Sequence, residues 1–220
     1  MKLNFFDSLL FFQWACMIAS ATISLKLIGN KRTPEYMNKF YLYSLIAGVY
    51  SIYAISQKYF HFTSKHTLDL FGTVLLIFHF IFLSSFIYGV LPNKKLSFLS
   101  KLMFTSLLIA VIFFIFIDNI YIAIALTNFS LVVFCCFYYL QLFEKMPSVI
   151  LLKEPSFWVI NGIFFCMCAT IPVYSLRDYF FTNYPYDLFL TIGCIISFSY
   201  GMMHLFFIKA YLCSTSLPKA

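Results

Sequence analysis

The sequence predicts an all-α fold, a polytopic transmembrane bundle of seven helices. Hydrophobic residues make up 62% of the 220 positions and charged residues only 10%, whereas soluble domains carry about 25% charged residues. The mean hydropathy of +0.90 is spread over the whole chain. The sequence therefore lacks a polar block of the ~50 residues that a soluble catalytic or nucleic-acid-binding domain needs. Seven apolar stretches each approach the ~20 residues that cross a hydrocarbon core.

These stretches belong to a single domain, residues 1–220, and residues that end helices separate them. The first stretch ends before the Gly-Asn-Lys-Arg-Thr-Pro run at 29–34, the third at Pro92 and the fifth before Pro147, whereas Pro155 precedes the sixth and Pro185 the seventh. Only residues 118–120 join the fourth to the fifth, so these two must form an antiparallel hairpin. The predicted helices are residues 9–27, 40–57, 68–91, 101–117, 121–143, 156–176 and 187–208.

The distribution of basic residues between the loops predicts the orientation. Cytoplasmic loops are enriched in Lys and Arg, and one side of the predicted bundle has 11 of the 15 basic residues. The four on the other side are Lys2, Lys58, Lys65 and Arg177. The amino terminus is therefore expected outside and the carboxyl terminus inside, which agrees with an odd number of spans.

The source and location follow from composition. Only two of the 15 basic residues are arginine, and Phe (30) and Tyr (16) are abundant, as AT-rich codons would produce, so the bacterial inner membrane is expected. The basic residues stand singly between apolar runs, which does not predict a nucleic-acid partner. The small residues at 19–21 also fit a signal-peptide cleavage site. Asp7 and the apolar continuation to residue 27 favour a retained helix.

Polar side chains inside the bilayer are costly and are the candidate functional residues. His79 lies ~16 Å into the third stretch, near the bilayer centre, and His204 lies ~26 Å into the seventh, in its inner third. Each could instead be a neutral histidine bonded to a neighbouring helix. Amide side chains in transmembrane helices commonly form hydrogen bonds across helix interfaces, and Asn128 and Asn161 are expected to do so. The alternative is that they line a cavity. These four residues form the predicted polar core.

Cofactors, metals and catalytic residues are not expected. The depths of His79 and His204 differ by ~9 Å, which is too much for a shared haem or metal. Cys166 and Cys168 would point about 200° apart on a helix and make a poor chelate. Lys209 falls at the inner surface, where it cannot form a mid-helix Schiff base with retinal. The sequence shows no recognisable pairing of a nucleophile with a general base, so the chain is not expected to be an enzyme.

The inner loop at 151–158 has a structural and a functional interpretation. Pro155 suits a first helical turn, Glu154 complements the positive end of the helix dipole, and Trp158 suits the membrane interface. The same three residues could form a cytoplasmic docking surface for a partner protein.

Four segments together resemble a group of small seven-helix bacterial integral membrane proteins. They are FHFIFLS at 78–84, FCCFYY at 134–139, LLKEPSFW at 151–158 and FFIKAYLC at 206–213. Such proteins are often encoded near two-component sensor kinases, so the resemblance implies a signalling role and a sensor kinase as a partner. It implies no activity and no functional residue.

Two functions remain open. The first is a non-enzymatic sensory module that couples a ligand or a membrane state to a cytoplasmic partner. The second is a small-molecule transporter that works as an oligomer, because seven short helices enclose little volume. A polar cavity open to one face and ringed by Asn128, Asn161 and His79 would favour transport. A sealed core with an outer pocket would favour sensing.

Overall fold

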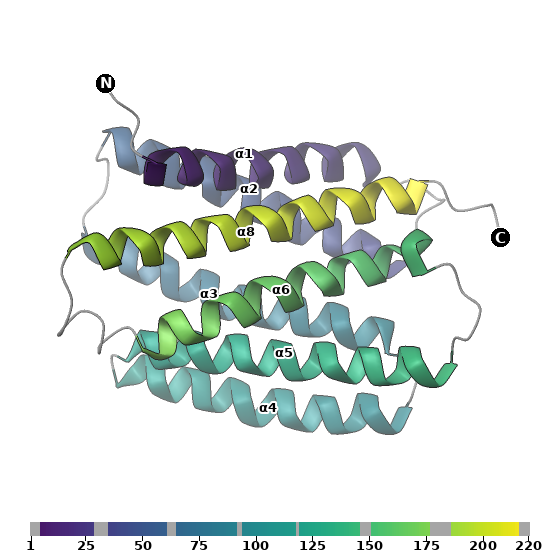
Figure 1. Ribbon diagram of the computed structural model, residues 1–220. Helices are drawn as coiled ribbons and strands as arrows, with labels where there is room; N and C mark the ends of the chain where they lie inside the picture. The colour runs from purple at the N-terminus through teal and green to yellow at the C-terminus, as the bar shows by residue number, and fades with distance from the viewer. Residues whose placement is uncertain are drawn as a thin grey trace.

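The computed structural model is all-α over the residues that it describes, which are 5–28, 35–60, 65–91, 94–117, 119–145, 151–176 and 186–215. Seven α-helices and one short 3₁₀ helix account for these ranges (Figure 1). The helices are α1 (Phe5–Leu27), α2 (Glu35–Phe60), α3 (Lys65–Val90), α4 (Lys94–Phe116), α5 (Ile120–Lys145), η1 (Leu151–Lys153), α6 (Pro155–Ser175) and α8 (Tyr186–Thr215).

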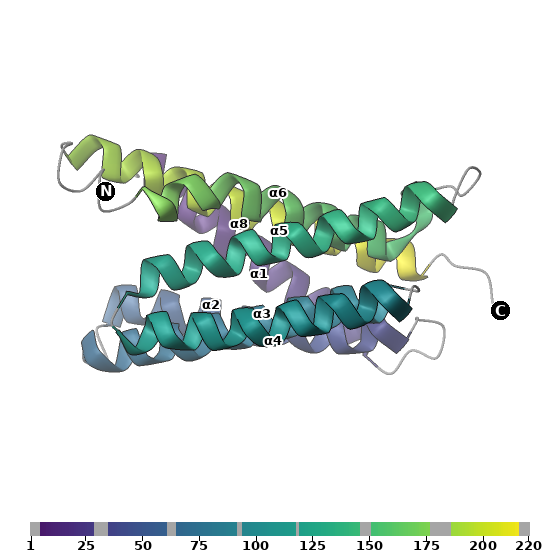
Figure 2. The ribbon, with the colours of Figure 1, turned by 90° about the horizontal axis from the view of Figure 1, so that it is seen from below.

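Successive helices run antiparallel, so the chain begins at one end of the bundle and finishes at the other (Figure 1). Helix α8 packs between α1 and α6, and α2 packs against α1 and is hydrogen-bonded to α8 through Tyr41–Ser214 and Ser44–Tyr211. Helix α5 joins the two halves of the bundle because it contacts α6 as well as α3 and α4 (Figure 2). The α4–α5 pair is the short hairpin expected from the three-residue connection.

Four described helical segments are long and apolar enough to cross a membrane: Phe5–Leu27, Ile120–Leu142, Pro155–Ser175 and Leu190–Ser214. Three further helices contain shorter apolar segments, at Phe40–Tyr53, Leu76–Val90 and Lys101–Phe116. The most different boundaries from those predicted are the start of α4, at Lys94 instead of 101, and the end of α8, at Thr215 instead of 208. Hydropathy locates the apolar part of a helix, whereas backbone hydrogen bonding continues into the polar flank.

The interior is aromatic, and large apolar side chains also cover the outside. Phe40 is fully buried, with ring centroids 4.8 Å from Phe86 and 4.7 Å from Phe207. On the outer faces, by contrast, Ile109 is 64% exposed and Phe129 is 56% exposed. Exposed apolar side chains along helices are the surface that a bilayer solvates.

Two glycines allow helices to approach closely. A Cβ atom added at Gly48 of α2 would lie 2.4 Å from the Cβ of Ala21 on α1, and one added at Gly162 of α6 would lie 2.8 Å from the Cβ of Phe206 on α8. Real Cβ atoms do not approach this closely, so both contacts need glycine. Small residues at such contacts are typical of helix packing in membranes.

Gly48→Ala is expected to lower the free energy of unfolding by about 1–3 kcal/mol, because the new methyl group meets a Cβ that cannot move without its backbone. Gly89→Ala is the matched control. A Cβ there would lie 3.9 Å from Tyr36, an ordinary contact, so stability should be unchanged or slightly higher. Unfolding in mixed detergent micelles measures both variants. Equal stability of the two would contradict the packing of α1 on α2.

Candidate functional site

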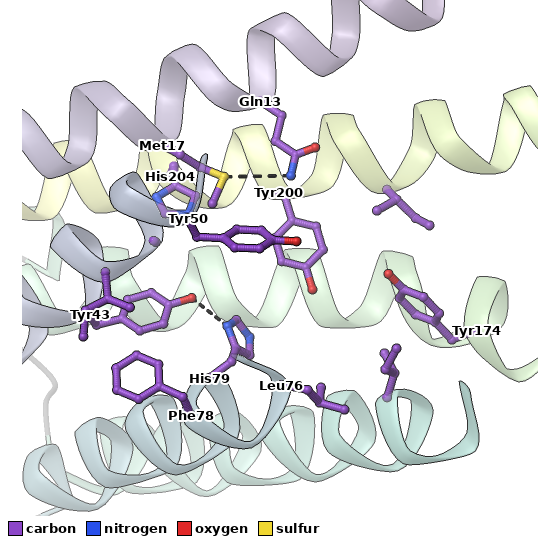
Figure 3. A pocket seen from close by; sticks show the side chains of 14 residues that line it. Gln13, Met17, Tyr43, Tyr50, Leu76, Phe78, His79, Tyr174, Tyr200 and His204 are labelled. Atoms are coloured by element: carbon purple, nitrogen blue, oxygen red, sulfur yellow. Dashed lines mark hydrogen bonds between the residues drawn. The ribbon is translucent and has the colours of Figure 1, made fainter. Parts of the chain in front are cut away.

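A pocket of about 280 Å³ lies within the bundle, and six helices line it: α1, α2, α3, α5, α6 and α8 (Figure 3). His79 and His204 both line it, and no Asp, Glu, Lys or Arg does. Tyr43, Tyr50, Tyr174 and Tyr200 form much of its wall. The pocket therefore combines aromatic walls with two imidazoles and has no charged side chain among its described lining residues.

His79 is anchored to α2. Its Nδ1 lies 2.7 Å from the hydroxyl oxygen of Tyr43, and Figure 3 shows this contact at the edge of the pocket. The Tyr43 ring stacks on Phe78 and Phe82 of the histidine's own helix. His79 is 8% exposed, and its Nε2 has no hydrogen-bond partner among the described residues. One side of the imidazole is held, and the other is unpaired.

His204 is anchored in the same way to α1. Its Nδ1 lies 2.8 Å from Ser20 Oγ, and the Ser20 hydroxyl also donates to the carbonyl oxygen of Met17 at 2.9 Å. His204 is 1% exposed, and no described atom is bonded to its Nε2. An unpaired buried nitrogen costs about 1–3 kcal/mol in a folded protein. Two histidines that line one pocket therefore each carry a polar atom whose burial the described side chains do not offset.

The described helix boundaries change the depth estimate that separated the two histidines. Helix α3 begins at Lys65 instead of 68, so His79 is 14 residues into its helix and His204 is 18 residues into α8. The difference is then about 6 Å at 1.5 Å per residue. Tyr200 also links them, because its ring centroid is 6.4 Å from that of His79 and it lies one turn before His204. Both histidines thus border one pocket.

Asn128 and Asn161 do not line this pocket. Asn128 Nδ2 donates to Thr170 Oγ1 at 2.9 Å and so joins α5 to α6. Asn161 Nδ2 donates to the Phe157 carbonyl at 2.7 Å, and its Oδ1 accepts from the Tyr139 hydroxyl at 3.1 Å. Both amides act between helices, as the structural interpretation of these residues expects.

Thr170→Val is expected to cost about 0.6 kcal/mol, the average for a hydrogen bond between transmembrane helices, because the Asn128 amide loses its acceptor without loss of side-chain volume. Unfolding in mixed micelles gives this value. Asn128→Leu combined with Thr170→Val serves as the control, since removal of both partners should restore part of the loss. A double variant that is less stable than either single variant would contradict the contact.

Glu154, Pro155 and Trp158 lie at the opposite end of the bundle from the start of α1 (Figure 1). Glu154 is the N-cap of α6 and Pro155 its first helical residue, but the glutamate makes no side-chain capping bond. Its Oε1 instead accepts from the hydroxyls of Tyr36 at 3.0 Å and Ser156 at 3.2 Å. Glu154 therefore ties α2 to the start of α6.

Trp158 completes this end of the bundle. Its Nε1 donates to the carbonyl oxygen of Leu152 at 2.8 Å, and the Lys209 ammonium lies 5.7 Å from the centroid of its ring. The ammonium of Lys209 thus lies within reach of a cation–π contact with Trp158. Leu152 itself is 61% exposed.

No family model matches the chain, and no curated protein or solved structure matches it. The resemblance to seven-helix bacterial membrane proteins therefore stays a prediction.

Metal-ligand clusters of three or more His, Cys, Asp or Glu side chains do not occur in the described ranges. Cys166 is buried whereas Cys168 is exposed, so the two thiols lie on different faces of α6, as their spacing predicts.

The sequence reasoning missed the partners of the two histidines. Ser20 and Tyr43 were not singled out, although helical spacing carries a signal for both. Gln13, Met17 and Ser20 recur at steps of four and three on α1, and Tyr43 and Tyr50 are seven apart on α2. Polar residues at these steps share one helix face, and each of these faces meets the pocket.

Proposed function

We propose that the chain is a non-enzymatic sensory module of the bacterial inner membrane, which binds a small ligand in the His79–His204 pocket and signals to a partner protein. The observation that carries this proposal is one pocket lined by two buried histidines, each of which has an Nε2 atom without a partner among the described residues. A protein that only needed stability would gain from apolar residues at these positions. A ligand that enters the pocket and turns these side chains toward it would supply the missing partners.

The proposed topology has seven spans, with the amino terminus outside. Three shorter apolar segments in addition to the four long ones support this number, and the 11 to 4 distribution of basic residues supports the orientation. Two lining residues, Ile124 near the start of α5 and Tyr174 near the end of α6, lie toward the end of the bundle that holds the amino terminus. In the proposed topology the pocket therefore extends toward the outer face.

The transport alternative receives less support. A transport cavity was expected to be ringed by Asn128, Asn161 and His79, whereas only His79 lines the pocket. The pocket toward the outer end is the arrangement expected for sensing.

The route to a partner would run through the helices that line the pocket. Helix α2 carries Tyr43 and Tyr50 of the pocket wall, and its first residues reach Glu154 through Tyr36. Helix α6 carries Tyr174 at one end and begins beside Glu154 at the other. A ligand that shifts α2 relative to α6 would change the Tyr36–Glu154 contact at the inner end. Exposed Leu152 is the contact proposed for the partner, a sensor kinase or another cytoplasmic or membrane protein.

Site-specific photo-crosslinking tests this proposal. A benzophenone amino acid at Leu152 in native membranes should crosslink to a discrete partner protein, whereas the same probe at Ile109, equally exposed on the outer face of α4, should not. His79→Leu in the Leu152 probe protein should change the yield at least threefold, because the two sites are coupled. Identical adducts from both positions, or a yield that does not respond to His79→Leu, would reject the sensory role.

A further inference from the structure

Two exposed lysines lie at the end of the bundle where α6 begins and α8 finishes (Figure 1). Lys153 is the last residue of η1, and Lys209 lies in the last two turns of α8. Neither lysine forms an ion pair within the described part of the chain. Glu154, the acidic side chain described at this end, instead accepts hydrogen bonds from Tyr36 and Ser156. The described residues therefore provide no counter-charge for either lysine.

Trp158 connects the two lysines. The Lys209 ammonium lies 5.7 Å from the centroid of the Trp158 ring. The ring Nε1 donates at 2.8 Å to the carbonyl oxygen of Leu152, the residue before Lys153. The Cys213 thiol, one turn after Lys209, lies 3.6 Å from the same carbonyl oxygen and so joins η1 to α8. Lys153, Trp158 and Lys209 thus form one surface, the Trp158 patch.

An aromatic row extends from this patch along α6 and α8. The Trp158 ring stacks on Phe206 with centroids 5.9 Å apart, and the Phe206 ring lies 6.5 Å from that of Phe165. Phe165 is 40% exposed, and Leu205, one turn before Lys209 on the same face of α8, is 39% exposed. Both belong to helical segments that are apolar enough to cross a membrane. The patch therefore has a charged end and an apolar side.

This combination matches the two parts of an anionic phospholipid. A phosphate provides the negative charge that the two lysines lack, and each lysine near a membrane surface favours anionic lipids about fivefold. Tryptophan is typical of the headgroup level of a membrane, and Trp158 lies three residues after Pro155, where the apolar segment of α6 begins. A free phosphate ion would contact the lysines but not the aromatic row.

We propose that the Trp158 patch binds one anionic phospholipid. The lipid phosphate lies between Lys153 and Lys209, and an acyl chain lies along the aromatic row. The patch is separate from the pocket of the two histidines, because none of its residues lines that pocket. The proposal depends neither on the sensory role nor on the side of the membrane that this end faces.

Trp158 itself can report the lipid that contacts it. The chain has two tryptophans, so Trp14→Phe leaves Trp158 as the source of tryptophan fluorescence, and phenylalanine keeps a ring at the buried position 14. Lipids with brominated acyl chains quench this fluorescence on contact. Anionic phosphatidylglycerol and zwitterionic phosphatidylcholine with the same brominated chains are compared in mixed micelles. Phosphatidylglycerol is expected to reach half-maximal quenching at a mole fraction about 25-fold lower, which is about fivefold for each lysine.

Variants in the Trp14→Phe protein assign the preference to the patch. Lys209→Gln and Lys153→Gln should each lower the preference for phosphatidylglycerol about fivefold, and the double variant should abolish it. Lys209→Arg keeps the charge and should keep the preference. Lys101→Gln is the matched control, because it removes the same charge from an exposed position on α4. Its preference should equal that of the parent protein.

Three results would overturn the proposal. The first is equal quenching by the two lipids. The second is a loss in Lys101→Gln as large as that in Lys209→Gln, because the preference would then follow net charge. The third is relief of quenching by inorganic phosphate beyond that by sodium chloride of equal ionic strength, which would assign the lysines to a free anion. Each result would leave the crosslinking test of the sensory role unaffected.

Discussion

Phe129→Asp is expected to lower the free energy of unfolding by about 2.5–3.5 kcal/mol or more, the cost of a charge near the centre of a spanning helix. Phe129 is 56% exposed and lies in the long apolar part of α5. On a protein surrounded by water, an exposed phenylalanine could be replaced by aspartate with a change of about 0.5 kcal/mol or less. The large loss is expected only if this face contacts lipid.

Leu152→Asp is the matched control for this experiment. Leu152 has a similar exposure of 61% but lies in η1, at the end of the bundle beyond the apolar segments. Its carboxylate would remain hydrated, so a change within about 0.5 kcal/mol is expected. Phe129→Leu separates the loss of the ring from the gain of charge. Unfolding in mixed micelles compares the three variants, and similar losses for the two aspartates would contradict lipid contact at Phe129.

Helix positions were readable from the sequence because a backbone in lipid must satisfy its own hydrogen bonds. Each of the seven apolar stretches lies within one of the seven described helices or differs from it by a residue at one end. The helix ends were less predictable. Lys94 and Lys95 are compatible with a helix but lower the local hydropathy, so the start of α4 was placed too late.

The candidate site was readable only in part. His79 and His204 stand out because histidine is rare in apolar helices. Their partners do not stand out, because serine and tyrosine are unremarkable in a membrane helix. Tyr43 is one of 16 tyrosines, and the sequence does not distinguish it or Ser20 from the others. Which of them meets a histidine depends on how α1 packs on α8 and α2 on α3. These contacts depend on tertiary packing. Helical periodicity predicts which face of a helix meets the pocket, but it does not predict which residue on that face contacts the histidine.

Alkaline phosphatase fused after Ala220 is expected to be inactive, and a fluorescent protein fused at the same position is expected to be bright. The phosphatase folds only outside the inner membrane, whereas the proposed carboxyl terminus is inside because 11 of 15 basic residues flank that side. Phosphatase fused after Asn183, in the connection proposed to lie outside, is the control. Its activity should exceed that of the Ala220 fusion at least tenfold.

The side of the amino terminus then decides the number of spans. An odd number places the two termini on opposite sides, whereas the four long apolar segments alone would place them on the same side. The seven described helices run alternately between the two ends of the bundle. With only four spans, α1 and α5 would cross the membrane in the same direction, and no span between them would return the chain to the starting side. A cysteine at Asn4 should react with an impermeant maleimide added to intact spheroplasts, while the parent protein without this cysteine sets the background. Protection of Asn4→Cys together with an inactive Ala220 phosphatase fusion would require an even number of spans and reject the seven-span topology.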